Sequence, residues 1–428
     1  MKFEILHPAD QIVMLMQRIY DCGMTTTSGG NLSIKDEEGD IWITPGGIDK
    51  GNLTRDDIVC VKPDGTVVGP HKPSIELPFH KKVYDARPEA GAVLHAHPPA
   101  LVSFSIVGMT PNTSLIPNAH LVCGQVGMAK YDLPGSDLLG KNIELKFREG
   151  CNVVIMENHG MVTMGKNLFQ AFMRFETLDF CARLEIGARR LGKVNSLNSK
   201  QLSIAQSKQN IEMKEFIPKK YSNKERKARR EMSEIIHRAY RKKLFTSTQG
   251  TLSYKLDKNS FLITPYGVDR MYLEPENIVR IDNGMREEGK IPSRSVLLHK
   301  NIYLKHKNIN AVMIAHPPNI MSFALSNTKF DTKIIPESYY LLREIATFPF
   351  GINIEKPEKI VEKLSDETPI VMIQNDCLIV SGGSLLEVFD RLEVAEFSGK
   401  ALLDGQVLGP LHPINDEQIE KLKKAFDI

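Results

Sequence analysis

The sequence predicts an α/β protein in which one domain type, a sheet covered by helices, occurs twice in tandem. Three observations carry this prediction: the chain length, a set of repeated segments, and the mixing of strand and helix patterns. With 428 residues the chain is longer than one hydrophobic core usually organises, so two or three domains are expected. A hydrophobic share of 42% and a charged share of 25% are ordinary for a globular protein.

Four segments of the first half return in the second half, in the same order and at nearly one spacing. The pairs are residues 43–50 with 263–270, 73–84 with 292–303, 95–99 with 314–318, and 154–159 with 371–376. This period is far longer than a solenoid unit, so it indicates a duplicated domain. We expect domains at residues 1–194 and 226–428. Residues 195–225, polar and basic without a sustained apolar period, are expected to form a linker.

Each copy shows the same succession of elements. An amphipathic helix comes first, then a strand after Gly or polar residues, a strand ending at a Thr-Pro turn, a helix after a Pro-Ser pair, two more strands and a long closing helix. The opening helix, first strand and closing helix are expected at residues 11–22, 31–35 and 168–191, and again at 231–243, 251–255 and 385–403. Strands and helices do not strictly alternate, so we expect antiparallel pairs in each sheet.

Residues 91–99, Gly-Ala-Val-Leu-His-Ala-His-Pro-Pro, hold the clearest chemical signal. A short run rich in Val and Leu that ends at prolines is typical of a buried strand followed by a loop. Side chains at i and i+2 of a strand share a face, so His95 and His97 should present two imidazoles side by side. Two imidazoles make half of a zinc site, and a third ligand would leave one position open for catalysis. Structural histidines also occur in this spacing, so the pair alone leaves both interpretations open.

The second copy acts as an internal control for these residues. It keeps the residues suited to turns and packing, including His299 at the position of His80, and both of these histidines are expected to be structural. It replaces four polar residues and keeps one histidine: Ile314 stands for His95, Asp376 for His159, Ser295 for Glu76 and Thr251 for Asn31, while His316 matches His97. Loss of these residues together favours one metal-centred site in the first copy and argues against catalysis by the second.

With these features the chain resembles the class II aldolase/adducin superfamily, which includes fuculose-phosphate and rhamnulose-phosphate aldolases and ribulose-phosphate 4-epimerase. Five blocks in family order carry the resemblance: residues 28–31 (SGGN), 44–47 (TPGG), 73–76 (PSIE), 95–97 (HAH) and 158–160 (NHG). It covers residues 8–190 and, in degenerate form, 230–405. The resemblance implies a three-layer α/β/α domain with a mixed, largely antiparallel sheet. It also implies a homo-oligomer, a dimer or tetramer, and a zinc ion or another divalent metal bound by His95, His97 and His159.

Glu76 is the expected catalytic base. Lyase chemistry next to a carbonyl forms an enediolate, and a metal held by three neutral imidazoles keeps its double charge and open positions to stabilise that oxyanion. A carboxylate near the metal stays ionised and can move the proton. A Glu at a helix start can also simply complement the macrodipole, but its loss together with the histidines favours catalysis. A general acid must also protonate the aldehyde oxygen, and the sequence leaves His120 and Tyr131 as the two candidates.

The residues expected to bind substrate or its phosphate are Ser28, Gly30, Asn31, Gly47 and Ser74. Amides of the loop at 28–31 can cradle an anion, and Gly47 and Ser74 resemble phosphate contacts of the family. Gly46 stands where these aldolases carry Thr, and Ile75 where they carry a second Ser. Each missing hydrogen bond to a charged group removes about 1.5–3 kcal/mol, so the substrate can be a sugar phosphate bound differently or a sugar without phosphate.

The sequence therefore predicts a zinc-dependent lyase, most simply one that cleaves a ketose or ketose phosphate by a retro-aldol reaction through an enediolate. A dehydratase or decarboxylase of a related sugar phosphate or sugar acid is the first alternative, and a non-enzymatic adducin-like scaffold is the second.

The expected partner is a small sugar or sugar phosphate. A net charge of +3 creates no general field for nucleic acid or membrane, and the basic run at residues 219–230 is typical of a solvated helix face. No apolar run reaches the length of a membrane span. Six scattered cysteines without a C-x-x-C spacing suit reduced thiols in a cytoplasm.

Overall fold

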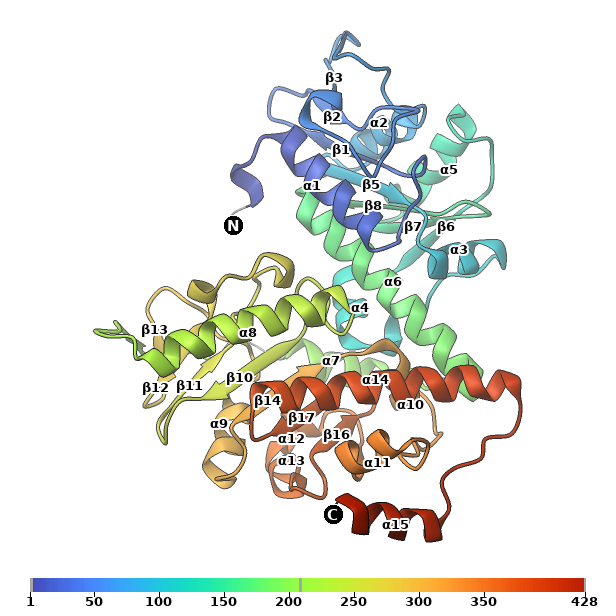
Figure 1. The fold of residues 1–428 in the computed structure, drawn as a ribbon. Coiled ribbons are helices and arrows are strands. Elements are labelled where there is room, and N and C mark those ends of the chain that lie inside the picture. The colour runs from blue at the N-terminus through green and yellow to red at the C-terminus, as the bar shows by residue number, and fades with distance from the viewer. Residues whose placement is uncertain (1–2, 208–209, 427–428) are drawn as a thin grey trace. The chain divides into compact units, whose positions relative to one another are not determined.

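The computed structural model describes residues 3–207 and 210–426. The chain forms two compact units, the first consisting of Met1–Thr113 with Asn118–Arg183 and the second of Ser114–Pro117 with Leu184–Ile428. Each unit contains one sheet covered by helices (Figure 1). The predicted α/β class and the tandem duplication are therefore confirmed. The division between the units falls inside a long helix, earlier than residue 195; the predicted domain boundaries stay a prediction.

The sheet of the first unit is mixed but largely antiparallel. Its strands are β1 (Asn31–Lys35), β2 (Ile41–Ile43), β3 (Val59–Val61), β4 (Val67–Val68), β5 (Ala92–Ala96), β6 (Val126–Ala129), β7 (Val153–Met156) and β8 (Met161–Gly165). Within the described residues their order is β4-β3-β2-β1-β5-β8-β7-β6. All neighbours run antiparallel except β6 and β7, which run parallel.

Helices cover both faces of this sheet. They are α1 (Pro8–Asp21), α2 (Leu77–Ala86), α3 (Pro99–Ile106), α4 (Pro117–Cys123), α5 (Asp137–Arg148) and α6 (Leu168–Leu191), with 3-10 turns at Phe3–Ile5, Arg55–Asp57 and Thr113–Leu115. On one face α1 contacts α6, where the guanidinium of Arg18 lies 4.4 Å from the ring centroid of Phe172. On the other face α2 and α5 pack against the sheet (Figure 1). This is the three-layer arrangement that the resemblance implied.

Alternation along β5 determines which side chains reach which layer. Val93 belongs to the core between the sheet and α2 and α5, together with Phe79 and Ile143. Its neighbour Leu94 is equally buried but points to the opposite face. Burial of each large apolar side chain contributes about 1.5–3 kcal/mol. His95 follows Leu94 and therefore faces the α2 layer, where its ring centroid lies 5.8 Å from that of Phe79.

The sheet of the second unit repeats the first and adds one strand. Its strands are β9 (Glu215–Phe216), β10 (Thr251–Lys255), β11 (Ser260–Ile263), β12 (Val279–Asp282), β13 (Met285–Glu287), β14 (Ala311–Ala315), β15 (Ile345–Phe348), β16 (Ile370–Ile373) and β17 (Leu378–Gly382). Among the described residues the order is β15-β16-β17-β14-β10-β11-β12-β13-β9. The register also repeats, since Thr251 pairs with Ile314 as Asn31 pairs with His95.

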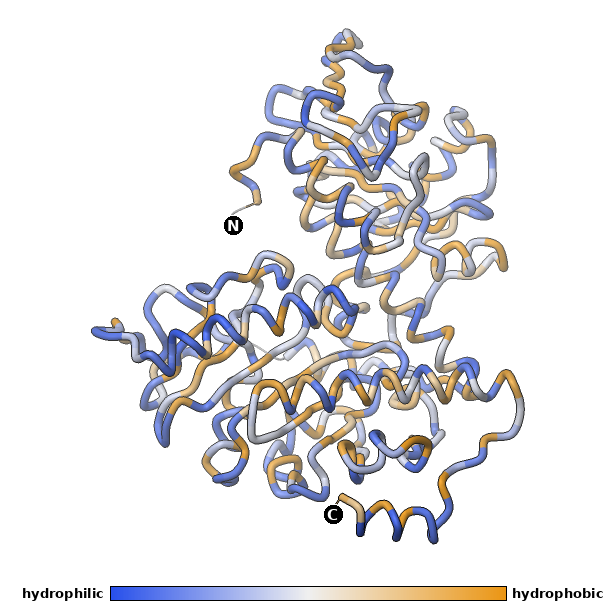
Figure 2. Tube along the Cα trace, viewed as in Figure 1, coloured by the Kyte–Doolittle hydropathy of each residue, from blue (hydrophilic) through white to orange (hydrophobic). Residues whose placement is uncertain are grey.

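The helices of the second unit differ from the prediction at the start. They are α7 (Ser199–Gln206), α8 (Asn223–Arg241), α9 (Val296–Lys305), α10 (Pro318–Ala324), α11 (Pro336–Leu342), α12 (Ile352–Glu355), α13 (Pro357–Lys363), α14 (Leu385–Leu408) and α15 (Asp416–Phe426), with 3-10 turns at Arg270–Tyr272 and Pro275–Asn277. In the segment expected as a linker, α7 forms and β9 pairs in parallel with β13. Apolar residues are interspersed with polar ones along α8 and α14 (Figure 2), as suits helices that cover a sheet with one side.

Helix α8 begins eight residues before the predicted position, and its basic residues are not all solvated. The Oγ of Ser222 accepts a hydrogen bond from the N–H of Glu225 at 3.1 Å and caps the helix. Arg229 is buried between the carboxylates of Glu225 and Glu287, at 2.8 and 2.7 Å. The start of α8 therefore packs on its own unit through ion pairs instead of an apolar stripe. Among the described residues, no helix has the length and apolar character needed to cross a membrane.

Candidate functional site

Three imidazoles meet at one end of the first sheet. His95 is the fourth residue of β5, His97 follows the end of that strand, and His159 lies in the turn between β7 and β8. One ring nitrogen from each lies within 4.8 Å of the other two, and the Nε2 atoms of His95 and His97 are 2.9 Å apart. The predicted side-by-side placement of the first two imidazoles is present, and the turn brings the third to them.

The backbone determines how the imidazoles present their nitrogens. Nδ1 of His95 lies 2.8 Å from the carbonyl oxygen of Met161, and since a carbonyl only accepts, Nδ1 carries the proton. Nε2 of His95 then presents a lone pair to the cluster, which is the form a metal ligand needs. His159 is held by a tight turn in which Asn158 adopts φ +53°, a left-handed conformation that Asn tolerates better than most residues.

Burial keeps these imidazoles neutral. It lowers the pKa of His95 to about 3 and the pKa of His97 to about 3, with the charges of the neighbouring histidines as a second cause. Burial also lowers the pKa of His159. A neutral imidazole binds a metal ion, whereas a protonated one cannot. The three rings are therefore in the metal-binding form at neutral pH.

Glu76 completes the cluster from the start of α2. Its Oε2 accepts a hydrogen bond from Nδ2 of Asn31 at 2.6 Å and lies 3.3 Å from Nε2 of His95. Its Oε1 lies 3.6 Å from Nε2 of His159 and is buried, with no hydrogen-bond partner among the described residues. A buried carboxylate oxygen of this kind is costly unless a cation or a proton satisfies it. Three neutral imidazoles and one carboxylate are a donor set that fits a divalent metal ion.

The family described as "Class II Aldolase and Adducin N-terminal domain" matches residues 10–186 and 230–403. The chain belongs to this family. It carries the family domain twice, and the matched ranges contain the two sheets described above.

Similar proteins match one copy of the domain. An L-fuculose phosphate aldolase from Methanococcus maripaludis is 31% identical over 175 residues, which cover 41% of this chain and 93% of the relative. A 3-oxo-tetronate 4-phosphate decarboxylase from Haemophilus influenzae is 29% identical over 177 residues, covering 40% and 84%. A solved structure of an L-fuculose 1-phosphate aldolase is 29% identical, covers 47% of this chain and 95% of its own, and has a TM-score of 0.43. This class II aldolase-family protein is a metal-dependent lyase.

The loops expected to bind substrate converge on the cluster. The N–H of Ser74 donates to the carbonyl oxygen of Thr44 at 3.2 Å, and the N–H of Glu76 donates to Oγ of Ser74 at 3.3 Å. Asn31 contacts the cluster through its hydrogen bond to Glu76. Gly30, at φ +75°, lies so close to β5 that an added Cβ would be 2.8 Å from the carbonyl oxygen of His95. The remaining predicted residues are Ser28, which is exposed, and Gly47, which has φ +71°. The binding roles of all five stay a prediction.

The candidates for the general acid lie apart in the chain. His120 is a half-buried residue of α4, and Tyr131 follows β6 with 55% of its surface exposed. The N–H of Tyr131 donates to a carboxylate oxygen of Glu157 at 3.2 Å. Neither the burial of these residues nor this contact selects one of them as the acid.

In the second unit, the residues at the positions equivalent to the cluster make other interactions. Ile314 packs against the hydrophobic core of that unit. Oδ2 of Asp376 accepts a hydrogen bond from Asn353 at 2.7 Å. The hydroxyls of Ser293 and Ser295 lie 3.0 Å apart. The residues that replace His95, His159 and Glu76 therefore serve packing and local hydrogen bonds.

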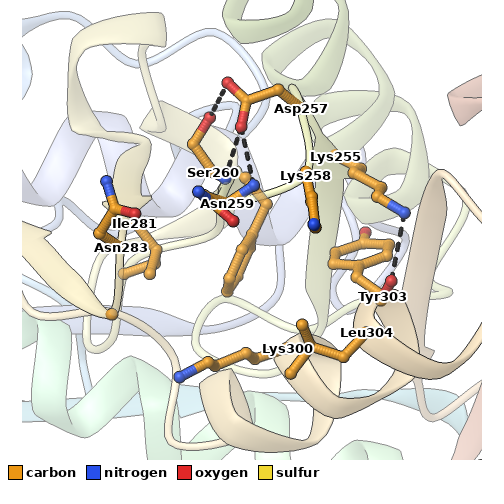
Figure 3. Close-up of a pocket in the computed structure, with 12 residues that line it drawn as sticks. Lys255, Asp257, Lys258, Asn259, Ser260, Ile281, Asn283, Lys300, Tyr303 and Leu304 are labelled. Atoms are coloured by element: carbon orange, nitrogen blue, oxygen red, sulfur yellow. Dashed lines mark hydrogen bonds between the residues drawn. The ribbon is translucent and has the colours of Figure 1, made fainter.

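The second unit also has a pocket of about 210 Å³ at the far end of β10 from Thr251. Lysines line it, together with the rings of Phe261 and Tyr303 (Figure 3). Lys255 reaches across to donate to the carbonyl oxygen of Tyr303 at 3.1 Å. None of the described residues that line the pocket is equivalent to a member of the histidine cluster, so the pocket is a separate feature of the unit.

Proposed function

We propose that the first unit is a zinc-dependent lyase that cleaves a carbon–carbon bond of a ketose or ketose phosphate by a retro-aldol reaction. The observation that carries this proposal is the position of Glu76, a buried carboxylate placed within 3.3–3.6 Å of the imidazoles of His95 and His159. His95, His97 and His159 would hold zinc, or another divalent ion. When bound, the ion supplies Lewis-acid stabilisation of the oxyanion that develops next to the substrate carbonyl.

Glu76 is the proposed proton carrier. In the cleavage direction the residue left open above, His120 or Tyr131, takes the hydroxyl proton and passes it to water, and the Glu76 carboxylate takes up one proton from water. The carbon–carbon bond breaks to give an aldehyde, and its electron pair stays on the other fragment as an enediolate. Glu76 in its acid form then protonates that fragment at carbon, and in the reverse direction its carboxylate removes the same proton. Oε1 is the suitable atom because Asn31 already occupies Oε2.

Ser28, Gly30, Asn31, Gly47 and Ser74 are the proposed substrate-binding residues. The relatives are named for sugar-phosphate substrates, which favours a phosphorylated ketose here. Gly46 and Ile75, the latter 71% exposed, supply no hydroxyl, so we expect phosphate to be bound mainly by backbone amides of the loops.

A decarboxylase of a sugar-acid phosphate is the second candidate. It is favoured by the 29% identity to a 3-oxo-tetronate 4-phosphate decarboxylase, and loss of CO₂ next to a carbonyl leaves a similar enediolate. A dehydratase using the same residues remains the third choice. The expected homo-oligomer and the cytoplasmic location stay predictions, which solution mass and cell fractionation test.

An assay of zinc-loaded protein against ketose phosphates, free ketoses and sugar acids tests the function, with aldehyde and CO₂ release measured separately. Glu76→Gln should lower kcat by about 10²–10⁴-fold and still hold one zinc per chain when zinc is supplied in excess. Ser295→Ala, the equivalent position of the second copy, should leave kcat unchanged. Full activity of Glu76→Gln would overturn the assigned role, and no product from any substrate would overturn the function.

A further inference from the structure

A buried chain of hydrogen bonds runs from Tyr84 to Glu76 in the first unit. Its links, in order, are Tyr84 Oη to Ser33 Oγ at 2.7 Å, Ser33 Oγ to His80 Nδ1 at 2.7 Å, His80 Nε2 to Asn31 Oδ1 at 2.5 Å, and Asn31 Nδ2 to Glu76 Oε2 at 2.6 Å. Each of the five residues is less than 9% exposed. Such a chain is shielded from competition by water, so each link constrains the next.

Glu76, at the end of the chain, determines which group donates and which accepts in each hydrogen bond. The Glu76 carboxylate only accepts, so the amide nitrogen of Asn31 donates and its oxygen is left to accept. Nε2 of His80 must then carry the proton, and Nδ1 accepts from the hydroxyl of Ser33. Burial lowers the pKa of His80 to about 3, so the ring is neutral and one tautomer serves both bonds. His80 thereby determines which way the Asn31 amide faces.

The start of α2 carries two members of this hydrogen-bond chain. Glu76 precedes the first residue of α2 and His80 lies four residues later, so both side chains project from one face of the helix. The ring of His80 also stacks on Phe79 at a centroid distance of 4.6 Å. With Oε2 of Glu76 held by Asn31, Oε1 is turned toward the imidazole of His159.

The described residues of the second unit repeat the distal half of the chain. Ser253 Oγ lies 2.6 Å from Nδ1 of His299 and 2.6 Å from Oη of Tyr303. Lys255 lies 5.9 Å from the centre of the Tyr303 ring (Figure 3), as Lys35 lies 5.8 Å from that of Tyr84.

At the end that carries the carboxylate in the first unit, the second unit has Thr251 in place of Asn31 and Ser295 in place of Glu76. The hydrogen bonds among serine, histidine and tyrosine therefore serve the fold in both copies. The further bonds through Asn31 to Glu76 belong to the first copy.

We propose that His80 is a positioning residue for the lyase: through Asn31 it holds the Glu76 carboxylate in the orientation that faces the three imidazoles. This proposal rests on the proposed function for its catalytic consequence, and on the geometry of the described residues for its structural part. His299 is the matched control: it makes the same bond to a serine that also contacts a tyrosine, while Ser295 stands at the position of the carboxylate.

The test compares His80→Leu with His299→Leu in the full chain. Both substitutions remove the serine contact, so both should lower Tm to a similar extent. Only His80→Leu should weaken zinc binding, by about 10–100-fold as for other residues that orient a metal site, measured by competition with a chromophoric chelator. It should also lower kcat with KM nearly unchanged and alter the absorption spectrum of the cobalt-substituted protein.

A conservative variant separates positioning from folding. His80→Gln keeps a donor for the Asn31 oxygen and should recover most of the zinc affinity, even if Tm stays low. Equal zinc affinity in His80→Leu, His299→Leu and the natural protein would overturn the proposal, as would equal losses in both leucine variants. A natural protein that binds zinc but cleaves no substrate overturns the proposed function alone, since the affinity comparison still decides the role of His80.

Discussion

Gly160 faces the imidazole of His97 so closely that a Cβ at Gly160 would lie 2.5 Å from Cδ2 of the ring and 2.7 Å from the carbonyl oxygen of Ala96. The second of these neighbours is backbone and cannot move aside. The turn after β7 therefore reaches the end of β5 only because residue 160 has no side chain. This close approach is what brings His159 to the other two histidines. The second copy has Cys377 at this position, and its described residues form no such cluster.

Gly160→Ala should therefore damage the metal site more than the fold. We expect zinc affinity to fall by at least about tenfold, because the turn must retreat and take His159 with it. Chelator competition measures the affinity, and circular dichroism monitors the fold. Cys377→Ala, a change of similar size in the second copy, is the control and should bind zinc normally. Unchanged affinity of Gly160→Ala would contradict the close-contact argument.

Metal content should depend on the first copy alone. The natural protein is expected to hold one zinc per chain, which His97→Ala loses and His316→Ala retains, since the positions beside His316 carry Ile314 and Asp376. Elemental analysis of dialysed protein measures this directly. Two equivalents per chain, or loss of metal in His316→Ala, would show that the second copy also binds zinc.

Stability of the metal-free protein should fall as the pH is lowered from about 6.5. Burial lowers the pKa of His80 from 6.5 to about 3, so between these values the unfolded chain binds a proton that the folded chain does not. Unfolding is then favoured by up to about 1.4 kcal/mol for each pH unit for this one histidine. Urea unfolding at pH 7, 6 and 5 measures the slope. His80→Leu should show a shallower slope, and an identical slope would mean that His80 is not buried and neutral.

The left-handed residue that precedes His159 should tolerate glycine but not a branched side chain. Asn158 has φ +53°, and a β-branched residue is strained there by about 1–2 kcal/mol. Asn158→Val should lower the free energy of unfolding by roughly that amount and weaken zinc binding, whereas Asn158→Gly should do neither. Urea titration and zinc competition provide the two measurements. Equal behaviour of the two variants would exclude backbone strain as the cause.

Much of the fold and the cluster could be predicted from sequence because the relevant signals are local or repeated. The two-residue period of a strand places His95 and His97 on one face whatever the rest of the chain does. The duplication then shows which residues the second copy lost, and this singled out His159 and Glu76 without any geometry.

What could not be predicted depends on contacts between segments far apart in the chain. His80 was expected to be structural because the second copy keeps a histidine, His299, at the same position. The difference lies in Asn31, 49 residues away, and only the folded sheet brings the two together. The start of α8 was missed for another reason: its buried face is made of Glu225 and Arg229, which an apolar period does not detect. Ser222 followed by Glu225 was a usable signal, because this spacing is typical of a helix cap.

The short strand β9 has a consequence for association between chains. By pairing with β13 it occupies one border of the second sheet with a segment of the same chain. At the matching border of the first sheet, the last strand among the described residues is β4, whose Val67 and Val68 are about half exposed. In the first sheet that border is therefore left to a strand of only two residues, and so short an edge is itself a protection against strand addition by a neighbouring molecule.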